Sequence, residues 1–298
     1  NYSIMASPKP NFFIIGAPKC GTTSLHHYLS SHSQITMSVP KEPHYFSTDI
    51  KNGGIRDKEE YLGCFSHGNE KTVAIGESST LYLYSKVAVQ NIYNFDKKSK
   101  FIVMVRNPIE IAQSFHQVAL KVFGETETNF QKAWLLEQNR KAGKKIPKGC
   151  IDRQLILYGN IAKIGRQIER FISYISPKNI HFIIYDDFKN SPKREYIKVL
   201  KFLKVNNEVP VNFPLYNKSQ RIKSETLTKL TNYASFFKKK LNIRTEFSVA
   251  NKIHKANVTD KPLDKLPKNF QLKMNKFFLH DVNLISQFVK KDLSKWRV

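Results

Sequence analysis

The sequence lacks several features that would assign it to a class at once. It has only three cysteines, Cys20, Cys64 and Cys150, and no CxxC pair. Neither a disulfide framework nor a zinc finger is therefore expected, and a reducing compartment is the simplest interpretation. No stretch comes near the ~18 apolar residues of a membrane-spanning helix. The amino terminus shows no basic segment followed by an apolar one, so no secretory signal is predicted.

Acidic residues are scarce relative to basic ones. Asp plus Glu number 24 and Lys plus Arg 49, which gives a net charge of +25. Such an excess attracts anions of any kind, whether nucleic acid, phosphorylated cofactors, acidic glycans or anionic membranes. No zinc-finger, cold-shock or RNP aromatic signature accompanies the charge, so nucleic acid is not expected as a partner. A basic nucleic-acid-binding protein is kept as an alternative hypothesis.

The location depends on where the natural chain starts. Four residues precede the first methionine, Met5. If Met5 is the natural start, a cytoplasmic protein is expected. If residues were removed ahead of it, a lost membrane anchor is the open alternative.

The order of apolar runs predicts an α/β fold. Apolar residues make up 41% of the chain, enough for a sizeable core. Four short, nearly continuous apolar runs are typical of buried parallel strands, at 11–16, 73–76, 101–105 and 180–185. Helical patterns follow at 22–31, 108–122, 128–141, 153–175, 192–203, 224–240, 268–279 and 281–291. We therefore expect a doubly wound, mainly parallel sheet in a single domain over 1–298, with a helical, Lys-rich extension at about 220–298.

In such a sheet, ligands bind outside the carboxyl ends of the strands. The first strand runs into residues 16–25, Gly-Ala-Pro-Lys-Cys-Gly-Thr-Thr-Ser-Leu, and then a helical pattern. The spacing of Gly16, Gly21 and Thr23 is that of a phosphate-binding loop, in which backbone N–H groups and a helix amino terminus surround an anion. A P-loop kinase or nucleoside triphosphatase is the alternative, but it needs a lysine where this chain has Thr22.

The segment from Pro18 to Leu25 closely resembles the 5′-phosphosulfate loop of sulfotransferases that use 3′-phosphoadenosine 5′-phosphosulfate (PAPS). The resemblance implies the P-loop sulfotransferase fold, PAPS as sulfuryl donor and 3′-phosphoadenosine 5′-phosphate (PAP) as product. It assigns Lys19 to the leaving oxygen as an electrostatic catalyst. It also assigns the donor's 5′-phosphate to the rest of the loop: Cys20, Gly21, Thr22, Thr23 and Ser24. A single leaving phosphate can be neutralised by a lysine, so no metal is expected.

A second motif follows the third predicted strand. Residues 106–108 are Arg-Asn-Pro, and Ser114 comes six residues after the proline. An arginine at a strand end is a fork-shaped donor suited to a phosphate dianion. The spacing resembles the family's 3′-phosphate motif, which implies that Arg106 and Ser114 bind that group. Lys218 and Arg221, in a polar and basic loop, are further candidates for binding the nucleotide.

Two other segments resemble the heparan sulfate and bacterial branch of this family. The first, residues 41–46, reads Lys-Glu-Pro-His-Tyr-Phe, and places Lys41 and His44 near the sulfate or the acceptor. The second, Gly-Glu-Ser followed by an aromatic residue, implies that Glu77 deprotonates the acceptor and that Tyr82 lies beside it. A carboxylate at the mouth of a parallel strand suits a general base. Asp186 and Asp187, after the fourth strand, are expected to be structural.

The sequence thus predicts a PAPS-dependent sulfotransferase acting on a hydroxyl or amine. Lys19, Lys41 and Glu77 are its predicted catalytic residues. The acceptor stays open between a carbohydrate or glycolipid and a small-molecule metabolite. Positive residues are spread along the chain rather than clustered, so the charge does not decide between them.

Overall fold

The computed structural model describes residues 9–210, 212–214, 221–222, 258–259 and 263–297. The chain divides into two compact units, which are described separately. Unit 1 takes residues 1–107, 164–217 and 279–297, and unit 2 takes 108–163 with 218–278 and residue 298.

A five-stranded sheet is the centre of unit 1. Its strands are β1 (Phe12–Gly16), β2 (Ile35–Met37), β3 (Ala74–Ser78), β4 (Lys100–Val105) and β5 (Ile180–Ile184). Their order is β2-β3-β1-β4-β5, and every pair is parallel. The four predicted strands and the parallel sheet are confirmed. The three-residue edge strand β2 was missed because so short a run carries no readable pattern.

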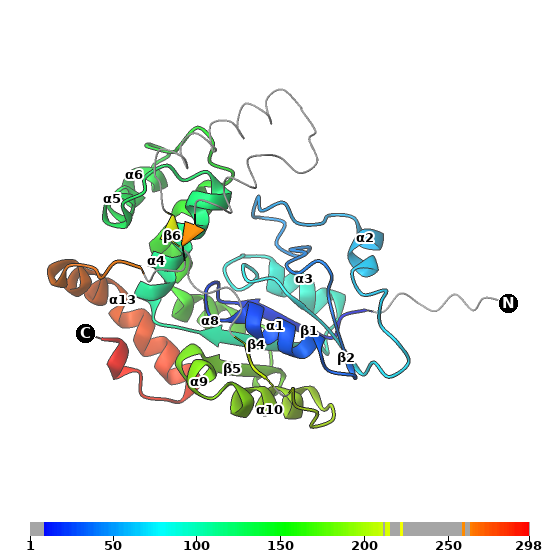
Figure 1. Cartoon of the computed structure of the whole chain (residues 1–298). Helices are drawn as coiled ribbons and strands as arrows, with labels where there is room; N and C mark the ends of the chain where they lie inside the picture. The colour runs from blue at the N-terminus through cyan, green and yellow to red at the C-terminus, as the bar shows by residue number, and fades with distance from the viewer. Residues whose placement is uncertain (1–8, 211, 215–220, 223–257, 260–262, 298) are drawn as a thin grey trace. The chain divides into compact units, whose positions relative to one another are not determined.

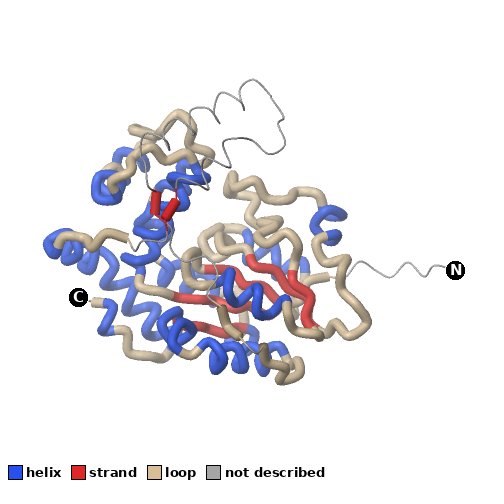
Figure 2. The backbone as a smooth tube through the Cα atoms, viewed as in Figure 1, coloured by secondary structure: helices blue, strands red, loops and turns tan. Residues whose placement is uncertain are grey.

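Helices flank this sheet, as Figures 1 and 2 show for α1, α3, α8, α9 and α10. The helices of unit 1 are α1 (Thr22–Ser30), α2 (Lys58–Gly63), α3 (Ala88–Phe95), α8 (Ile164–Ile172), α9 (Tyr185–Asn190) and α10 (Pro192–Leu203), with single 3₁₀ turns at Pro177–Asn179 and Ser294–Trp296. Phe12, Phe13, Ile14 and Ile15 have no exposed surface, although their side chains alternate between the two faces. Cover on both faces is why the strands read as continuous apolar runs.

The strand order places a switch point at β1. The chain goes from β1 to the β2 edge, returns through β3, and then crosses to β4 on the other side of β1. Loops leaving the carboxyl ends of β1 and β4 therefore diverge, which opens the crevice where ligands bind in doubly wound sheets. Residues 17–21 and 106–107 lie in these loops.

The carboxyl-terminal helix differs from the prediction. Instead of separate helices at 268–279 and 281–291, α13 runs unbroken from Lys268 to Val289. Asp281 is buried within it, and its carboxylate accepts hydrogen bonds from the backbone N–H groups of Gly165 (2.9 Å) and Arg166 (3.0 Å). This side chain caps the start of α8 rather than ending its own helix, a role that only the tertiary structure reveals.

The predicted helix 153–175 is likewise broken into three pieces. They are a 3₁₀ turn (Arg153–Ile156), α7 (Tyr158–Ala162) and α8. Leu157 and Lys163, which separate the three pieces, have non-helical backbone angles. The carboxylate of Glu137 accepts from the N–H of Gly159 (2.8 Å) at the start of α7, as Asp281 does for α8. Carboxylates from distant segments thus stabilise new helix starts inside one periodic stretch.

Unit 2 is mainly helical. It contains α4 (Pro108–Val118), a π-helical turn (Ala119–Phe123), α5 (Phe130–Leu135), α6 (Glu137–Lys141), α7 and the first half of α13. The short strands β6 (Arg221–Ile222) and β7 (Val258–Thr259) pair antiparallel. The predicted helix 224–240 lies outside the described residues.

A fully buried ion pair lies inside unit 2. Arg140 donates to both carboxylate oxygens of Glu125, at 2.6 and 2.9 Å, and Tyr158 Oη donates to the same carboxylate at 2.5 Å. Burial alone would raise the pKa of Glu125, but the hydrogen bonds and charge of Arg140 outweigh it, so the pKa is lowered. The pair fixes the loop after the π-helical turn to α6 and α7.

We expect Arg140→Ala to lower the free energy of unfolding by about 3–5 kcal/mol, because it leaves the Glu125 carboxylate buried without its partner. Urea denaturation followed by circular dichroism measures this loss. Lys141→Ala is the matched control, since its ion pair with Glu137 is partly exposed and contributes about 1 kcal/mol or less. Equal losses in the two variants would contradict the role given to the buried pair.

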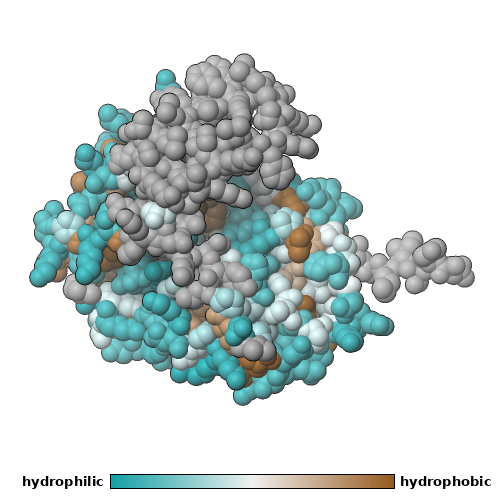
Figure 3. Space-filling model, in the orientation of Figure 1, coloured by the Kyte–Doolittle hydropathy of each residue, from teal (hydrophilic) through white to brown (hydrophobic). Residues whose placement is uncertain are grey.

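The surface fits the composition. Among the coloured residues in Figure 3, hydrophilic ones cover most of the visible surface and the apolar areas are small. Within the part of the chain that the structure describes, no helix combines the length and apolar character needed to cross a membrane.

Candidate active site

The loop between β1 and α1 has the geometry of an anion site. Gly21 caps α1 with a left-handed backbone (φ 88°), and no side chain caps the helix start. The first turn of α1 contains no acidic residue, so its N–H groups and the positive end of the helix dipole favour an anion. At Gly16 (φ 141°) a Cβ would lie 2.7 Å from the carbonyl oxygen of Thr80. Both glycines are therefore required by the backbone, as the sequence predicts.

Lys19 and Arg106 converge on this loop from β1 and β4. Arg106 Nη1 donates to the carbonyl oxygen of Lys19 at 2.9 Å, and its guanidinium lies 4.4 Å from the ring centre of Tyr185. Burial, with the charge of Arg106 adding to it, lowers the pKa of Lys19. A bound anion between the two cations would relieve their repulsion, so the pair fits a phosphate or sulfate group.

The other residues predicted to bind the donor are less accessible. Cys20 is completely buried, and its Sγ lies 3.5 Å from the carbonyl oxygen of Pro18, so only its backbone can face a ligand. Thr22 and Ser24 are also buried, while Thr23 is partly exposed.

The remaining predicted donor contacts lie outside unit 1. Ser114 is buried on α4, in unit 2. Lys218 lies outside the described residues, and for Arg221 the structure describes the backbone in β6 but not the side chain. These assignments stay predictions.

A charged cluster lies in the segment after β2. Lys41 Nζ is 2.8 Å from Glu42 Oε1, and His44 Nε2 is 3.0 Å from Glu42 Oε2. Thr80, after β3, donates from its N–H (3.3 Å) and its hydroxyl (2.9 Å) to Glu42 Oε2. The side chain of Glu42 is 31% exposed, and these partners contact both of its carboxylate oxygens. Burial alone would raise its pKa, but the hydrogen bond from His44 and the charge of Lys41 outweigh it and lower the pKa.

Backbone strain collects around the same groups. The structure describes six non-glycine residues with positive φ, and three of them are Lys19 (64°), Glu42 (64°) and His44 (52°). Left-handed backbone at non-glycine residues costs free energy, and such residues are often found at functional sites. The strain therefore supports a functional role for Glu42 as well as for the predicted Lys19 and His44.

Glu77 occupies a different environment from Glu42. Its side chain is completely buried at the end of β3. Ser79 Oγ donates to its Oε2 at 3.4 Å, and its Oε1 has no hydrogen-bond partner among the described residues. Burial raises the pKa of Glu77 to about 8, against the nearby hydroxyls of Tyr82 and Ser79, which favour the carboxylate. The group is therefore mainly a neutral acid at neutral pH.

Glu77 belongs to a network that supports the segment carrying Glu42. Ser79 Oγ accepts from the N–H of His44 at 3.0 Å, and Tyr82 Oη accepts from the N–H of Phe46 at 3.2 Å. Tyr82 is itself completely buried, and this burial does not favour its predicted contact with the acceptor. The contact stays a prediction. The network fixes the backbone on both sides of the charged cluster.

Sequence reasoning missed three residues of this site, namely Glu42, Thr80 and Tyr185. Glu42 had a readable signal, because it lies between Lys41 and His44 in a segment already singled out. Thr80 and Tyr185 had none, since each acts through a contact between segments distant in sequence. Among the described residues, no group of three or more His, Cys, Asp or Glu side chains is placed to hold a metal ion.

Comparison with known proteins shows what this chain is similar to. A family model described as "Sulfotransferase domain" matches residues 9–285. The membrane-associated sulfotransferase kil1 of Dictyostelium discoideum is 31% identical over 112 residues, which are 38% of this chain and 23% of that protein. Carbohydrate sulfotransferase 15 of Homo sapiens is 30% identical over 34% of this chain and 26% of its own length. The matched segments thus span about a quarter of these relatives.

A solved structure shares the fold. A sulfotransferase from Alicyclobacillus acidocaldarius aligns with a TM-score of 0.70 and 24% identity, covering 98% of this chain and 100% of that one. The predicted fold class is confirmed by this likeness together with the parallel sheet of unit 1.

Proposed function

Because this chain belongs to the sulfotransferase domain family, we propose that it transfers a sulfuryl group from PAPS to a hydroxyl or amine of an acceptor. When bound, PAPS supplies the activated sulfuryl group, and PAP remains as product. The observation that carries the proposal is the meeting of Lys19 and Arg106 at an uncapped helix start after β1. This arrangement suits a phosphorylated donor, although the chain has Thr22 where nucleoside triphosphatases have the lysine that binds the β- and γ-phosphates.

We assign a different role in binding or catalysis to each part of the site. The N–H groups at the start of α1 bind the 5′-phosphate, and Lys19 neutralises the charge that develops on the oxygen between phosphorus and sulfur. Arg106, whose guanidinium lies over the ring of Tyr185, binds a second phosphate. Lys41 stabilises the sulfuryl oxygens during transfer. Positioning and electrostatics thus supply most of the catalysis.

For the proton, we propose Glu42 as the base in place of the predicted Glu77. A base must reach the acceptor, and Glu42 is partly exposed whereas Glu77 is completely buried. Glu42 is also ionised at neutral pH, since its pKa is lowered. In this mechanism Glu77 acts through Ser79, supporting the backbone of His44.

For the acceptor, we propose a carbohydrate hydroxyl or amine, with a small-molecule metabolite as the second candidate. The relatives support the first candidate, since one of those reported above is named a carbohydrate sulfotransferase. The donor site would be the same in either case.

A thermal-shift assay tests the donor. We expect PAP to raise the melting temperature without added metal. At 100 times its dissociation constant, a ligand adds about 2.7 kcal/mol to the free energy of unfolding. Arg106→Ala should remove most of this shift, and Arg106→Lys should retain part of it. The control is Arg166→Ala, at an exposed side chain on α8. Stabilisation by ATP with magnesium, and none by PAP, would reject the proposal in favour of a P-loop kinase.

A further inference from the structure

The last 3₁₀ turn of unit 1, Ser294–Trp296, is built around a buried indole. Just before the turn, Asp292 accepts hydrogen bonds from the N–H (2.8 Å) and the hydroxyl (2.9 Å) of Ser294. The turn ends at Trp296, which is 4% exposed. A buried tryptophan usually donates its N–H to a partner, and that partner shows which part of the protein the turn holds in place.

Trp296 joins the ends of β4 and β5. Its Nε1–H donates to Asp186 Oδ2 at 3.0 Å, and its carbonyl oxygen accepts from Asn107 Nδ2 at 3.4 Å. Asn107 directly follows Arg106 at the end of β4, and Asp186 directly follows Tyr185 at the end of β5. Trp296 therefore contacts the neighbour of each of these two residues.

Arg106 and Tyr185 lie side by side where the two strands end. β4 and β5 are parallel with Val105 opposite Ile184, so these two residues are the next in register. The guanidinium of Arg106 lies over the ring of Tyr185, 4.4 Å from its centre. A Cβ added at Gly21 would lie 3.2 Å from two atoms of the same ring, so the ring also packs against the loop between β1 and α1. Tyr185 thus contacts both the arginine and the loop of the proposed donor site.

The last turn also holds the carboxylate next to Tyr185. Asp186 accepts from Trp296 and forms an ion pair with Lys295 at 3.0 Å. Burial alone would raise the pKa of Asp186, but the hydrogen bonds from Trp296 and Lys295 and the charge of Lys295 outweigh it and lower the pKa. The charge of Arg106 acts in the same direction. Asp186 is therefore ionised at neutral pH, and a hydrogen bond to an ionised acceptor is stronger than a neutral one.

The direction of an arginine decides how well it binds a phosphate, because its guanidinium presents its N–H donors in a fixed, planar fork. We propose that Trp296 is a positioning residue of the donor site, which keeps Arg106 over Tyr185 and directed at the second phosphate of the donor. This role rests on the proposed function, in which Arg106 binds that phosphate. Trp296 acts through Asn107 and Asp186 and touches no reacting group.

Isothermal titration calorimetry on the whole protein, with PAP and with adenosine 5′-monophosphate (AMP), tests this role. AMP lacks the second phosphate, so a residue that acts on Arg106 should affect PAP alone. Trp296→Phe keeps an aromatic ring but loses the N–H donor, and should weaken PAP binding about 3- to 10-fold, the effect of one hydrogen bond. The affinity for AMP should be unchanged. Asp186→Ala removes the acceptor of the same hydrogen bond and should show the same selective loss.

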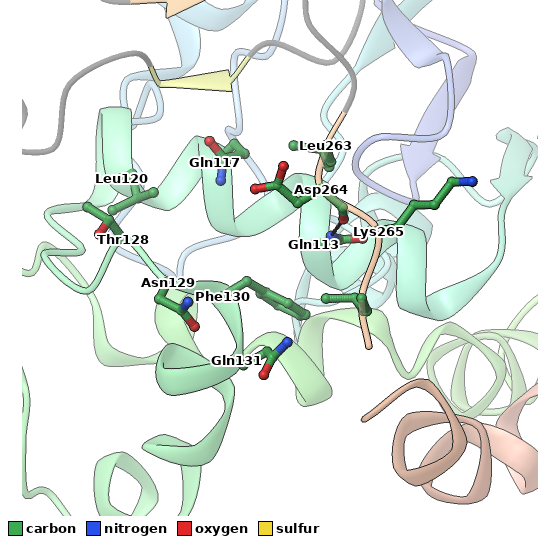
Figure 4. Close-up of a pocket in the computed structure, with 11 residues that line it drawn as sticks. Gln113, Gln117, Leu120, Thr128, Asn129, Phe130, Gln131, Leu263, Asp264 and Lys265 are labelled. Carbon is green, nitrogen blue, oxygen red and sulfur yellow. Dashed lines mark hydrogen bonds between the residues drawn. The ribbon is translucent and has the colours of Figure 1, made fainter. Parts of the chain in front are cut away.

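Trp134→Phe is the matched control, at the chain's other tryptophan. Trp134 packs against Phe130, with 6.1 Å between the ring centres, and Phe130 lines the cleft of unit 2 shown in Figure 4. The exchange should change neither affinity. In an Arg106→Ala protein, Trp296→Phe should have no further effect on PAP binding, because the residue that it positions is gone.

Three results would overturn the role of Trp296. They are equal losses of PAP and AMP affinity in Trp296→Phe, no change in either affinity, and an undiminished loss of PAP affinity in the Arg106→Ala background. The unchanged protein separates this role from the proposed function. If it bound PAP no more tightly than AMP, the second-phosphate role of Arg106 would fail together with that of Trp296. A normal preference for PAP that Trp296→Phe leaves intact would overturn the role of Trp296 alone.

Discussion

Replacing Lys19 by alanine should lower kcat by at least about 10²-fold, the usual cost of removing one preorganised group that stabilises developing charge. Lys19 lies in the loop after β1, its backbone carbonyl accepts a hydrogen bond from Arg106, and the charge of Arg106 contributes to lowering its pKa. No other lysine lies in the loop between β1 and α1, so a neighbour cannot take over this position. Single-turnover kinetics with labelled PAPS would measure the chemical step, and equilibrium dialysis with PAP the affinity.

The division between kcat and affinity makes this result specific. PAP affinity should fall by less than about tenfold, because the N–H groups of the loop and Arg106 remain. Lys97→Ala is the control, at an exposed lysine on the surface of unit 1, and should change neither quantity. A Lys19→Ala protein with turnover within threefold of the wild type would remove the electrostatic assignment, provided that its melting temperature is unchanged.

The elements that sequence reasoning predicted best are those with long, uniform patterns. The four core strands and the loop from Gly16 to Ser24 were found because burial on both faces and the phosphate-loop spacing are written in consecutive residues. The breaks at Leu157 and Lys163 were missed, because carboxylates from α6 and α13 fix the new helix starts. Such long-range caps leave no local signal.

The same distinction applies to the site. Lys19, Arg106, Lys41 and His44 were chosen from motifs, and the structure brings Lys19 to Arg106 and Lys41 to His44 through Glu42. The choice between two carboxylates could not be made from motifs. Glu77 lies at the end of β3 and Glu42 follows β2, and only the structure shows that the first side chain is completely buried and the second partly exposed.

Exchanging each carboxylate for its amide should separate the two roles. Glu42→Gln should lower kcat by at least about 10²-fold, because general-base catalysis contributes roughly 10²–10⁴-fold. Its PAP affinity should be unchanged, since no donor contact is removed. Glu77→Gln should retain kcat within about fivefold at pH 7, because a carboxyl group with a pKa of about 8 is already neutral there and glutamine has nearly the same shape. Glu59→Gln, at an exposed carboxylate of α2, is the control.

The pH dependence of kcat tests independently whether Glu42 or Glu77 is the general base. A base is active only when deprotonated, so catalysis by Glu77 would make kcat rise as the pH increases through about 8. Catalysis by Glu42 predicts no such rise between pH 6 and pH 9, since its lowered pKa keeps it ionised throughout. The flat profile is the expected result. The opposite result would be a rise of kcat near pH 8 in the wild type that disappears in Glu77→Gln, together with a large loss of kcat in that variant. Glu77 would then be the base, and Glu42 would be the residue that orients Lys41 and His44.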